Sequence, residues 1–198
     1  VFMPSKKNVK LVVAIGLMLL GLIMTVAVSQ ADTKEVHCYS VLSPIESSTG
    51  FSKIIESGCF DSFPESIEAA TSGQVILPED VDPATLTDSD LNPHLDFNRI
   101  VPNTTTVIGI DYKYSNFGGS SYTWTVTGVG CTDSLSYGIS QMPSGWDNSV
   151  SSARSYANCN HYYHWENKDN KGAVLDCGTS CSSMGVMDNQ TSSEQWHK

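Results

Sequence analysis

Two polar hexapeptides in the C-terminal half carry the residue types best suited to hold a metal ion. Residues 147–152 read DNSVSS, and residues 188–193 read DNQTSS. Both begin with an acid and an amide and end with two serines, so one pattern occurs twice. Carboxylate, hydroxyl and carbonyl oxygens in a short loop are the ligands that calcium prefers. The repeat therefore predicts two calcium-binding loops.

A second repeated pattern precedes each hexapeptide. Residues 112–119 read YKYSNFGG, with aromatic residues at the first and sixth positions and glycine at the eighth. Residues 165–172 read WENKDNKG and keep this spacing, with Asn170 in place of the second aromatic residue. Gly119 and Gly172 can adopt positive φ, which a tightly folded hairpin requires. Each hexapeptide is therefore expected to follow a folded hairpin.

The leading aromatic residue of each hairpin, Tyr112 or Trp165, is expected to cover its backbone. The last serine of each hexapeptide, Ser152 or Ser193, is expected to pin the loop to the hairpin by a hydrogen bond.

The region from Thr105 onward is typical of short β-strands. Residues 107–112 and 120–129 are rich in β-branched and aromatic side chains, and clusters of Gly, Ser, Asn and Asp interrupt them. No helical periodicity of useful length is present. The hairpin-to-hexapeptide gap is longer in the first copy, which predicts an insertion at residues 131–145. These features predict an all-β sandwich.

This combination resembles the βγ-crystallin family, whose Greek-key motif joins a folded hairpin to a loop of the form N/D-N/D-x-x-S/T-S. Both loops match at every defined position, and the second hairpin departs only at Asn170. The resemblance covers residues 105–198 and is carried by two copies of each pattern. It implies a βγ-crystallin-like Greek-key β-sandwich. The composition of the residues before it indicates a small mixed N-terminal segment.

The resemblance also implies two calcium ions per domain, at sites formed where two motifs pair about a pseudo-twofold axis. The leading acid of each loop, Asp147 or Asp188, would complete the site of the other loop. The implied ligand positions are Asp147, Ser149, Ser151, Asp188, Gln190 and Ser192, with backbone carbonyls near Lys113 and Glu166. Calcium would stabilise the fold by mass action. The affinity expected of an extracellular module is about 10⁻⁴–10⁻³ M.

The N-terminus has the pattern of a secretory signal peptide. Three lysines precede an apolar run at residues 11–28, and small residues then form a cleavage site before Asp32. The alternative is an uncleaved membrane anchor, because the run approaches the length of a spanning helix. No charged stop-transfer cluster follows, which favours cleavage. We therefore expect residues 1–31 to be removed and the protein to be secreted.

The chain that remains after cleavage is strongly acidic. It carries 8 basic and 21 acidic residues, a formal net charge of −13. This charge argues against nucleic acid and anionic membrane surfaces as partners.

All six cysteines lie after the signal peptide, and an even number in an exported chain predicts disulfide bonds. They are Cys38, Cys59, Cys131, Cys159, Cys177 and Cys181. Cys38 and Cys59 form the natural pair of the N-terminal part, and the sequence does not settle the pairing of the other four. A zinc site is the alternative, but residues 177–181 (CGTSC) lack a second such pair at zinc-finger spacing.

Residues 32–77 are expected to form a small disulfide-tied segment. Ser62 and Glu65 match a capping box and predict the start of a helix. Short strands are expected at residues 38–42 and 74–77.

Residues 78–104 are acidic and contain several prolines, which is typical of a linker. A propeptide or regulatory tail is the alternative for this stretch.

No catalytic motif is recognisable, and we do not expect an enzyme. The G-x-S-x-G, H-E-x-x-H and P-loop patterns are all absent. His161 and His164 would point to opposite faces of a strand, so they are poor partners for one ion. Both are expected to be surface residues.

Two other binding functions are alternatives to a calcium-stabilised module. Secreted inhibitors of extracellular metallopeptidases share the implied fold and are disulfide-linked, so the insertion at residues 131–145 could be a presented inhibitory loop. Adhesion to carbohydrate or to a surface rests only on the four tryptophans, which are more simply core and hairpin residues. They are Trp124, Trp146, Trp165 and Trp196.

Overall fold

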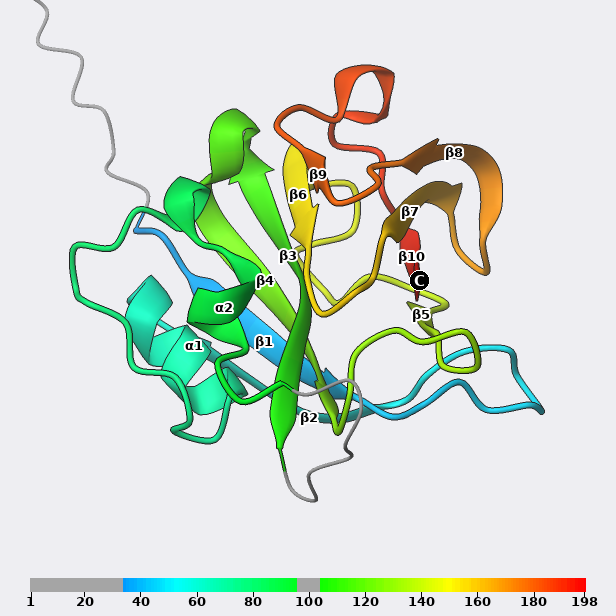
Figure 1. Ribbon diagram of the computed structural model, residues 1–198. Helices are drawn as coiled ribbons and strands as arrows, with labels where there is room; N and C mark the ends of the chain where they lie inside the picture. The colour runs from blue at the N-terminus through cyan, green and yellow to red at the C-terminus, as the bar shows by residue number, and fades with distance from the viewer. Residues whose placement is uncertain (1–33, 96–103) are drawn as a thin grey trace, which may run out of the picture. The chain divides into compact units, whose positions relative to one another are not determined.

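Two β-sheets pack face to face in the computed structural model, which describes residues 34–95 and 104–198 (Figure 1). One sheet has the strand order β2-β1-β4-β3-β6-β9, and the other has the order β5-β10-β7-β8. The strands are β1 (His37–Leu42), β2 (Ile54–Phe60), β3 (Thr105–Tyr114), β4 (Gly118–Thr127), β5 (Tyr137–Ile139), β6 (Ser152–Ser155), β7 (His161–Asn167), β8 (Lys171–Asp176), β9 (Ser180–Cys181) and β10 (Ser193–His197). The helical elements are α1 (Phe63–Ala70), η1 (Pro83–Thr85), α2 (Asp88–Leu91), η2 (Ser115–Phe117) and η3 (Gly185–Met187). The predicted all-β class is confirmed.

The predicted signal peptide, residues 1–31, lies outside the described residues. Within the described ranges, no helix has the length and apolar character needed to cross a membrane.

Each of the two motifs exchanges one short strand with the other sheet. Strands β3, β4 and β6 of the first motif lie in the larger sheet, while its β5 pairs with β10 in the smaller sheet. Strands β7, β8 and β10 of the second motif lie in the smaller sheet, while its β9 pairs with β6 in the larger one. Because each motif contributes to both sheets, the two motifs fold together as a Greek-key sandwich.

The N-terminal segment extends the larger sheet. Strand β1 pairs with β4 in parallel and with β2 in antiparallel register, and the predicted disulfide Cys38–Cys59 joins β1 to β2. All described residues from Lys34 to Lys198 form one compact unit. The disulfide-tied segment predicted at residues 32–77 therefore lies, from Lys34 on, in the same compact unit as the sandwich. A segment of this size buries too little surface to be stable alone. Here it is stabilised by the pairing of β1 with the edge of β4.

The stretch predicted to be a linker also packs against the sandwich, as far as residue 95. Leu86 and Leu91 are buried in one cluster with Val107 and Ile110 of β3. Asn92 accepts a hydrogen bond from the Val107 amide at 2.8 Å and donates one to its carbonyl at 3.0 Å. Residues 96–103 lie outside the described ranges.

Helix α1 begins as the capping box predicts. The Ser62 side chain accepts a hydrogen bond from the Glu65 amide at 3.3 Å, and the helix runs from Phe63 to Ala70. The strand predicted at residues 74–77 does not form. Instead, the Val75 amide donates to the Thr71 hydroxyl at 3.1 Å, so this backbone caps the helix end and has no ladder partner.

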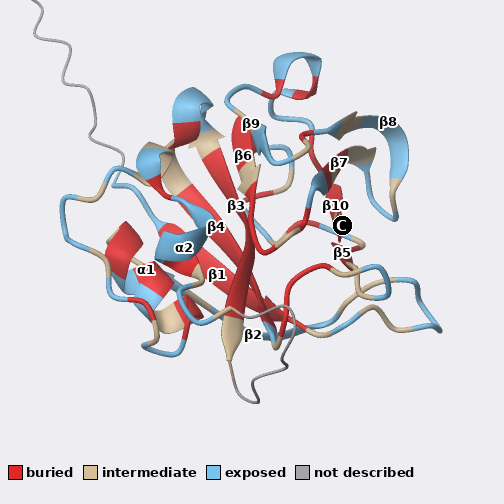
Figure 2. Ribbon diagram, in the orientation of Figure 1, coloured by how far each residue is buried: buried red, intermediate tan, exposed pale blue. Residues whose placement is uncertain are grey.

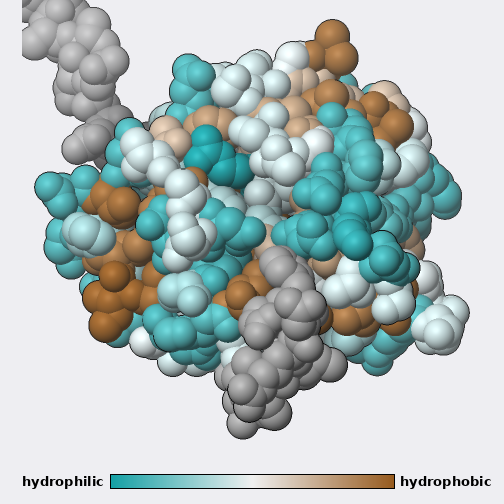
Figure 3. Space-filling model, viewed as in Figure 1, coloured by the Kyte–Doolittle hydropathy of each residue, from teal (hydrophilic) through white to brown (hydrophobic). Residues whose placement is uncertain are grey.

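The main core lies between the two sheets and includes three of the four tryptophans. Trp124, Trp146 and Trp196 are at most 5 % exposed, and Trp165 is half-buried. Figure 2 shows buried residues following β1, β3 and β4 across the larger sheet. Figure 3 shows exposed hydrophobic atoms in separate patches on the viewed face. The tryptophans are therefore core and hairpin residues, as expected.

Two further disulfides tie the sandwich. Cys131–Cys159 anchors the insertion of the first motif to the turn before β7, and Cys177–Cys181 closes the short loop between β8 and β9. No free cysteine is present among the described residues.

The first hairpin gives a direct test of this fold. A Cβ at Gly119 would lie 2.5 Å from the Tyr114 ring, at a φ of +75°. We expect Gly119→Ala to lower the free energy of unfolding by about 1–2 kcal/mol through backbone strain and by about 1–3 kcal/mol more through overpacking. Gly145→Ala is the matched control, because φ is +83° and no atom lies within 4 Å. Equal losses in denaturant titrations of the two variants would contradict the proposed ring contact.

Candidate metal-binding loops

The last serine of each hexapeptide fastens its loop to its own hairpin. The Ser152 hydroxyl donates to the Tyr114 carbonyl at 2.6 Å and accepts from the Phe117 amide at 2.9 Å. The same two bonds recur in the second copy, where Ser193 donates to Asn167 at 2.7 Å and accepts from Asn170 at 3.0 Å. The predicted role of both serines is confirmed.

Asn170 leaves the second hairpin intact. In the first hairpin, Asn116 and Phe117 both have positive φ, and Asp169 and Asn170 repeat this in the second. Asparagine tolerates the left-handed region better than phenylalanine does. The departure from the aromatic pattern therefore fits the backbone of this turn.

Gly119 and Gly172 have φ of +75° and +79°, as predicted. The residue that covers the first glycine is Tyr114, however, and not Tyr112. Tyr112 is 0 % exposed and belongs to the core. The pairing of β3 with β4 shifts register between Tyr112 and Tyr114, and this shift places the Tyr114 ring over the hairpin. In the second hairpin, Asn167 and Glu166 lie against Gly172 in place of Trp165.

The two hexapeptide loops lie side by side and bond to each other reciprocally. The Asn148 amide donates to the Thr191 carbonyl at 2.9 Å, and the Asn189 amide donates to the Val150 carbonyl at 2.9 Å. Asn148 and Asn189 have φ of +58° and +55°. This symmetry agrees with the pseudo-twofold axis implied by the resemblance.

The fifth residue of each loop faces the second residue of the other. The Ser151 hydroxyl lies 3.5 Å from Oδ1 of Asn189, and the Ser192 hydroxyl lies 3.4 Å from Oδ1 of Asn148. These distances are long for hydrogen bonds between oxygens. They match the separation of about 3.3–3.7 Å between two oxygens that bind one calcium ion at right angles. The donor set therefore fits a hard cation.

The first residue of each loop, Asp147 or Asp188, directly precedes the asparagine that faces the other loop. Oδ1 of Asp147 is buried and has no hydrogen-bond partner among the described residues. Asp188 is exposed, and its Oδ2 accepts from Nδ2 of Asn189 at 3.2 Å. The residues seen reaching across are Asn148 and Asn189, whereas the resemblance implied the two aspartates. An unpartnered buried carboxylate oxygen is a further feature that suits a cation.

The remaining predicted ligands sit at matching positions of the two motifs. Ser149 and Gln190 are the third residues of their loops, and their amides donate back to Trp146 and Met187 within tight turns. Lys113 and Glu166 lie at β-bulges, where one residue opposes two and the regular ladder is interrupted. The loops approach beside these bulges, since Ser151 N donates to Tyr112 O at 2.9 Å and Ser192 N donates to Trp165 O at 2.8 Å.

Asn148 and Asn189 are candidate ligands that the ligand prediction did not include. Their signal was present, because an amide occupies the second position of both hexapeptides. A side chain at this position reaches the other loop only after the two motifs pair, which no local pattern reports.

No family model and no curated protein matches the sequence. Among solved structures, the chain is similar to a betagamma-crystallin from an archaeon, at 21% identity over 46% of this chain and 96% of that chain, with a TM-score of 0.34. It is also similar to the N-terminal domain of protein S, at 13% identity over 45% and 93%, with a TM-score of 0.34. A third match is a double mutant of a betagamma-crystallin domain from Clostridium beijerinckii, at 16% identity over 45% and 96%, with a TM-score of 0.33.

The exchanged strands, the two serine-pinned hairpins and the reciprocal loops together carry the assignment of the fold. Residues 105–198 form a βγ-crystallin-like module. The strands β1 and β2 are an addition to its larger sheet, at the free edge of β4. The Greek-key architecture predicted from the two motifs is confirmed.

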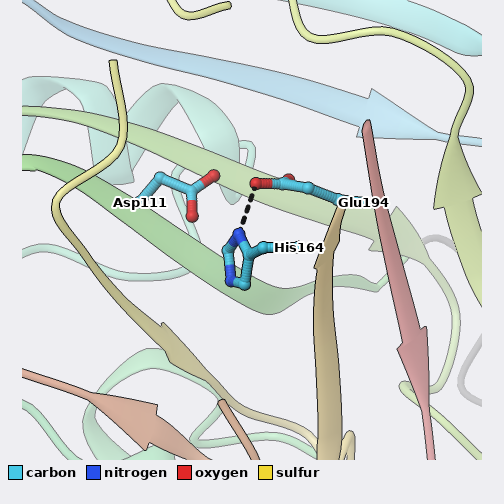
Figure 4. A group of neighbouring side chains, drawn as sticks. All are labelled: Asp111, His164 and Glu194. Atoms are coloured by element: carbon cyan, nitrogen blue, oxygen red, sulfur yellow. Dashed lines mark ion pairs between the residues drawn. The ribbon is translucent and has the colours of Figure 1, made fainter. Parts of the chain in front are cut away.

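A separate polar cluster lies inside the βγ-crystallin-like sandwich (Figure 4). Asp111 of β3, His164 of β7 and Glu194 of β10 are each 0 % exposed, and one ligand atom from each lies within 4.8 Å of the others. His164 was expected at the surface, but the alternation of β7 places it inside with Tyr162, while His161 is exposed. The prediction that the two histidines point to opposite faces is confirmed.

Burial dominates the protonation of this cluster. It raises the pKa of Asp111 well above its usual range, and the nearby Glu194 adds to the increase. Burial also raises the pKa of Glu194 to about 8 and lowers that of His164 to about 4. His164 is therefore neutral at neutral pH, and it does not compensate a negative charge on either carboxylate.

The hydrogen bonds of Ser152 and Ser193 to their hairpins can be tested by mutation. Ser152→Ala and Ser193→Ala each remove a donor and an acceptor from a folded hairpin, and each leaves a backbone carbonyl and an amide without partners. We expect each variant to lose about 1–3 kcal/mol of unfolding free energy, measured by denaturant titration in calcium-free buffer. Ser144→Ala is the control, because Ser144 is exposed. Variants as stable as this control would contradict the pinning role.

Proposed function

We propose that the βγ-crystallin-like module is a secreted calcium-binding domain, with two calcium ions held between its paired loops. The observation that carries this proposal is the reciprocal approach of the Ser151 and Asn189 oxygens and of the Ser192 and Asn148 oxygens at 3.4–3.5 Å. The buried, unpartnered Oδ1 of Asp147 supports it, because a cation would satisfy this oxygen.

Each ion would draw its ligands from both motifs. The first site would use the Ser151 hydroxyl, the Asn189 side chain and a backbone carbonyl of its own hairpin near Lys113. The second would use the Ser192 hydroxyl, the Asn148 side chain and the backbone near Glu166. The carbonyls of Ser149 and Gln190 complete the proposed set, and the charges of Asp147 and Asp188 favour a divalent ion.

Ligands shared between motifs would couple calcium to folding. The unfolded chain does not hold the two loops together, so calcium would bind only the folded state and stabilise it. With a dissociation constant of about 10⁻⁴ M, millimolar calcium would add about 1.4 kcal/mol per site. The role proposed for calcium is thus structural, and it requires no reaction.

Secretion is the setting that this proposal needs. The three disulfides are typical of an oxidising compartment, and extracellular calcium is abundant enough to fill sites of modest affinity. The signal-peptide pattern of residues 1–31 supports the same location.

Calorimetric titration of the protein lacking residues 1–31 tests the function. We expect heat of binding for two calcium ions and a rise in melting temperature at millimolar calcium. Ser151→Ala and Ser192→Ala are each expected to weaken one site by about tenfold, since each removes one neutral ligand. Ser144→Ala is the control and should bind as the wild type does. No heat and no thermal shift in the wild type would contradict the proposal.

The proposed sharing of calcium ligands between the two loops has a separate test. In a double-mutant cycle, Ser151→Ala and Asn189→Ala should affect the same ion, so their effects on calcium affinity should not add. Ser151→Ala and Asn148→Ala belong to different proposed sites and serve as the comparison pair. Additive effects for Ser151 with Asn189, equal to those of the comparison pair, would exclude ligand sharing of this kind.

Inhibition of an extracellular metallopeptidase remains an alternative on the same fold. It requires a presented loop, and the insertion at residues 131–145 supports this weakly. Cys131 is disulfide-bonded, β5 is paired within the smaller sheet, and only Asp133 and Ser134 are exposed between Cys131 and Ile139. Assay of the protein against a panel of metallopeptidases distinguishes this function from calcium binding.

A further inference from the structure

We propose that Asp111, His164 and Glu194 form a second kind of metal site, which binds one Zn²⁺ ion in the core between the two sheets. The site is distinct from the calcium loops in place and in ligand chemistry. It would join β3 of the larger sheet to β7 and β10 of the smaller one (Figure 4).

The ligand atoms have the spacing that a small ion requires. One atom from each of the three residues lies within 4.8 Å of the others, and Nδ1 of His164 lies 3.1 Å from Oε1 of Glu194. Two ligands of one zinc ion, each about 2.0–2.2 Å from the metal, lie roughly 3–4 Å apart. Small side-chain movements would therefore bring all three atoms to bonding distance.

The polar atoms of the cluster are incompletely partnered. Nε2 of His164 has no hydrogen-bond partner among the described residues, and Nδ1 faces Oε1 of Glu194 at 3.1 Å without the geometry of a hydrogen bond. Both side chains are 0 % exposed, so water does not satisfy them at the surface. Buried polar atoms almost always have partners. A metal ion would satisfy the nitrogen and the carboxylate oxygen together.

The composition of the site also suits a cation. Two carboxyl groups and one imidazole lie together in the core, and all three can offer lone pairs to a metal ion. Within the described part of the chain, no lysine or arginine forms an ion pair with Asp111 or Glu194. A divalent ion would displace the carboxyl protons on binding and balance the two charges that remain.

Neighbouring groups already orient the proposed ligands. Nε1 of Trp124 donates to Oδ2 of Asp111 at 2.8 Å, and the Tyr162 hydroxyl donates to Oδ1 at 2.7 Å. The same hydroxyl lies 3.1 Å from Oε2 of Glu194. Metal-binding carboxylates usually have such outer hydrogen bonds, which fix their orientation. Each carboxylate oxygen keeps a lone pair for a metal.

The ligand set selects among metals. One imidazole nitrogen and two carboxylate groups suit Zn²⁺, which binds nitrogen and oxygen in a compact four-coordinate shell. Calcium takes 6–8 oxygen ligands and does not favour imidazole. The cysteines of the described chain are all in disulfides and offer no competing thiolate site.

Burial implies how the ion enters. All three ligands are 0 % exposed, so zinc would be taken up as the two sheets close, and would then exchange slowly. The experiment therefore loads the metal during refolding. The chain lacking residues 1–31 is unfolded with its disulfides intact, refolded in one equivalent of ZnCl₂ with excess CaCl₂, desalted, and analysed for retained zinc by mass spectrometry.

We expect about one retained zinc per folded wild-type chain, and a loss of at least tenfold in retained zinc for His164→Gln and Glu194→Gln. Circular dichroism measures the folded fraction of each variant, and the retained zinc is expressed per folded chain. His161→Ala is the control for adventitious surface binding, because His161 is exposed beside Asp176, and it should retain zinc. Ser192→Ala should keep zinc while its calcium titration shows one weakened site, which separates this site from the proposed function.

Replacement of zinc by Co²⁺ gives a readout when a variant folds poorly. Bound Co²⁺ in a nitrogen–oxygen site is expected to give visible absorption in the refolded wild type and in His161→Ala. Folded wild type that retains neither zinc nor cobalt would overturn the proposal. Retention in His164→Gln equal to that of the wild type would overturn it as well.

Discussion

The reciprocal bonding of the two hexapeptide loops is the constraint on which the rest of the module depends. The Asn148 and Asn189 amides each donate to a carbonyl of the other loop, at 2.9 Å in both cases. Ser152 and Ser193 then hold each loop against its own hairpin. The loops therefore fix the two hairpins relative to each other. Neither motif alone can make the hydrogen bonds that hold its loop in place.

The strand exchange follows from the same arrangement. Strand β5 lies beside β10, and β9 lies beside β6, so each sheet contains one strand from the other motif. The core between them is filled by large aromatic side chains, with the rings of Trp124 and Trp196 5.5 Å apart. Strands β1 and β2 then cover the edge of β4, where unpaired backbone groups would otherwise be exposed.

Local patterns predicted the parts of the structure that depend on neighbouring residues. The hairpin glycines, the pinning serines, the helix cap at Ser62 and the Cys38–Cys59 bond are all of this kind. Pairings between distant segments were not predictable in this way. The parallel pairing of β1 with β4 joins residues about eighty positions apart, and the approach of Asn189 to Ser151 appears only when both motifs are folded.

The buried cluster shows a signal that sequence analysis could have used. His164 is two residues from Tyr162, and Glu194 is two residues from Trp196, so each polar side chain shares a strand face with a large aromatic one. Such a face is expected to point into the core. That His164 and Glu194 then meet Asp111 depends on the packing of two sheets, which the strand pattern alone does not contain.

We propose that the two paired loops hold two calcium ions between the motifs. Native mass spectrometry of the intact protein lacking residues 1–31, titrated with calcium, tests it most directly because it counts bound ions. The account predicts two ions per chain in the wild type and one in Ser151→Ala or Ser192→Ala at limiting calcium. A wild-type protein that stays calcium-free at millimolar calcium would contradict it, and so would variants that bind as many ions as the wild type.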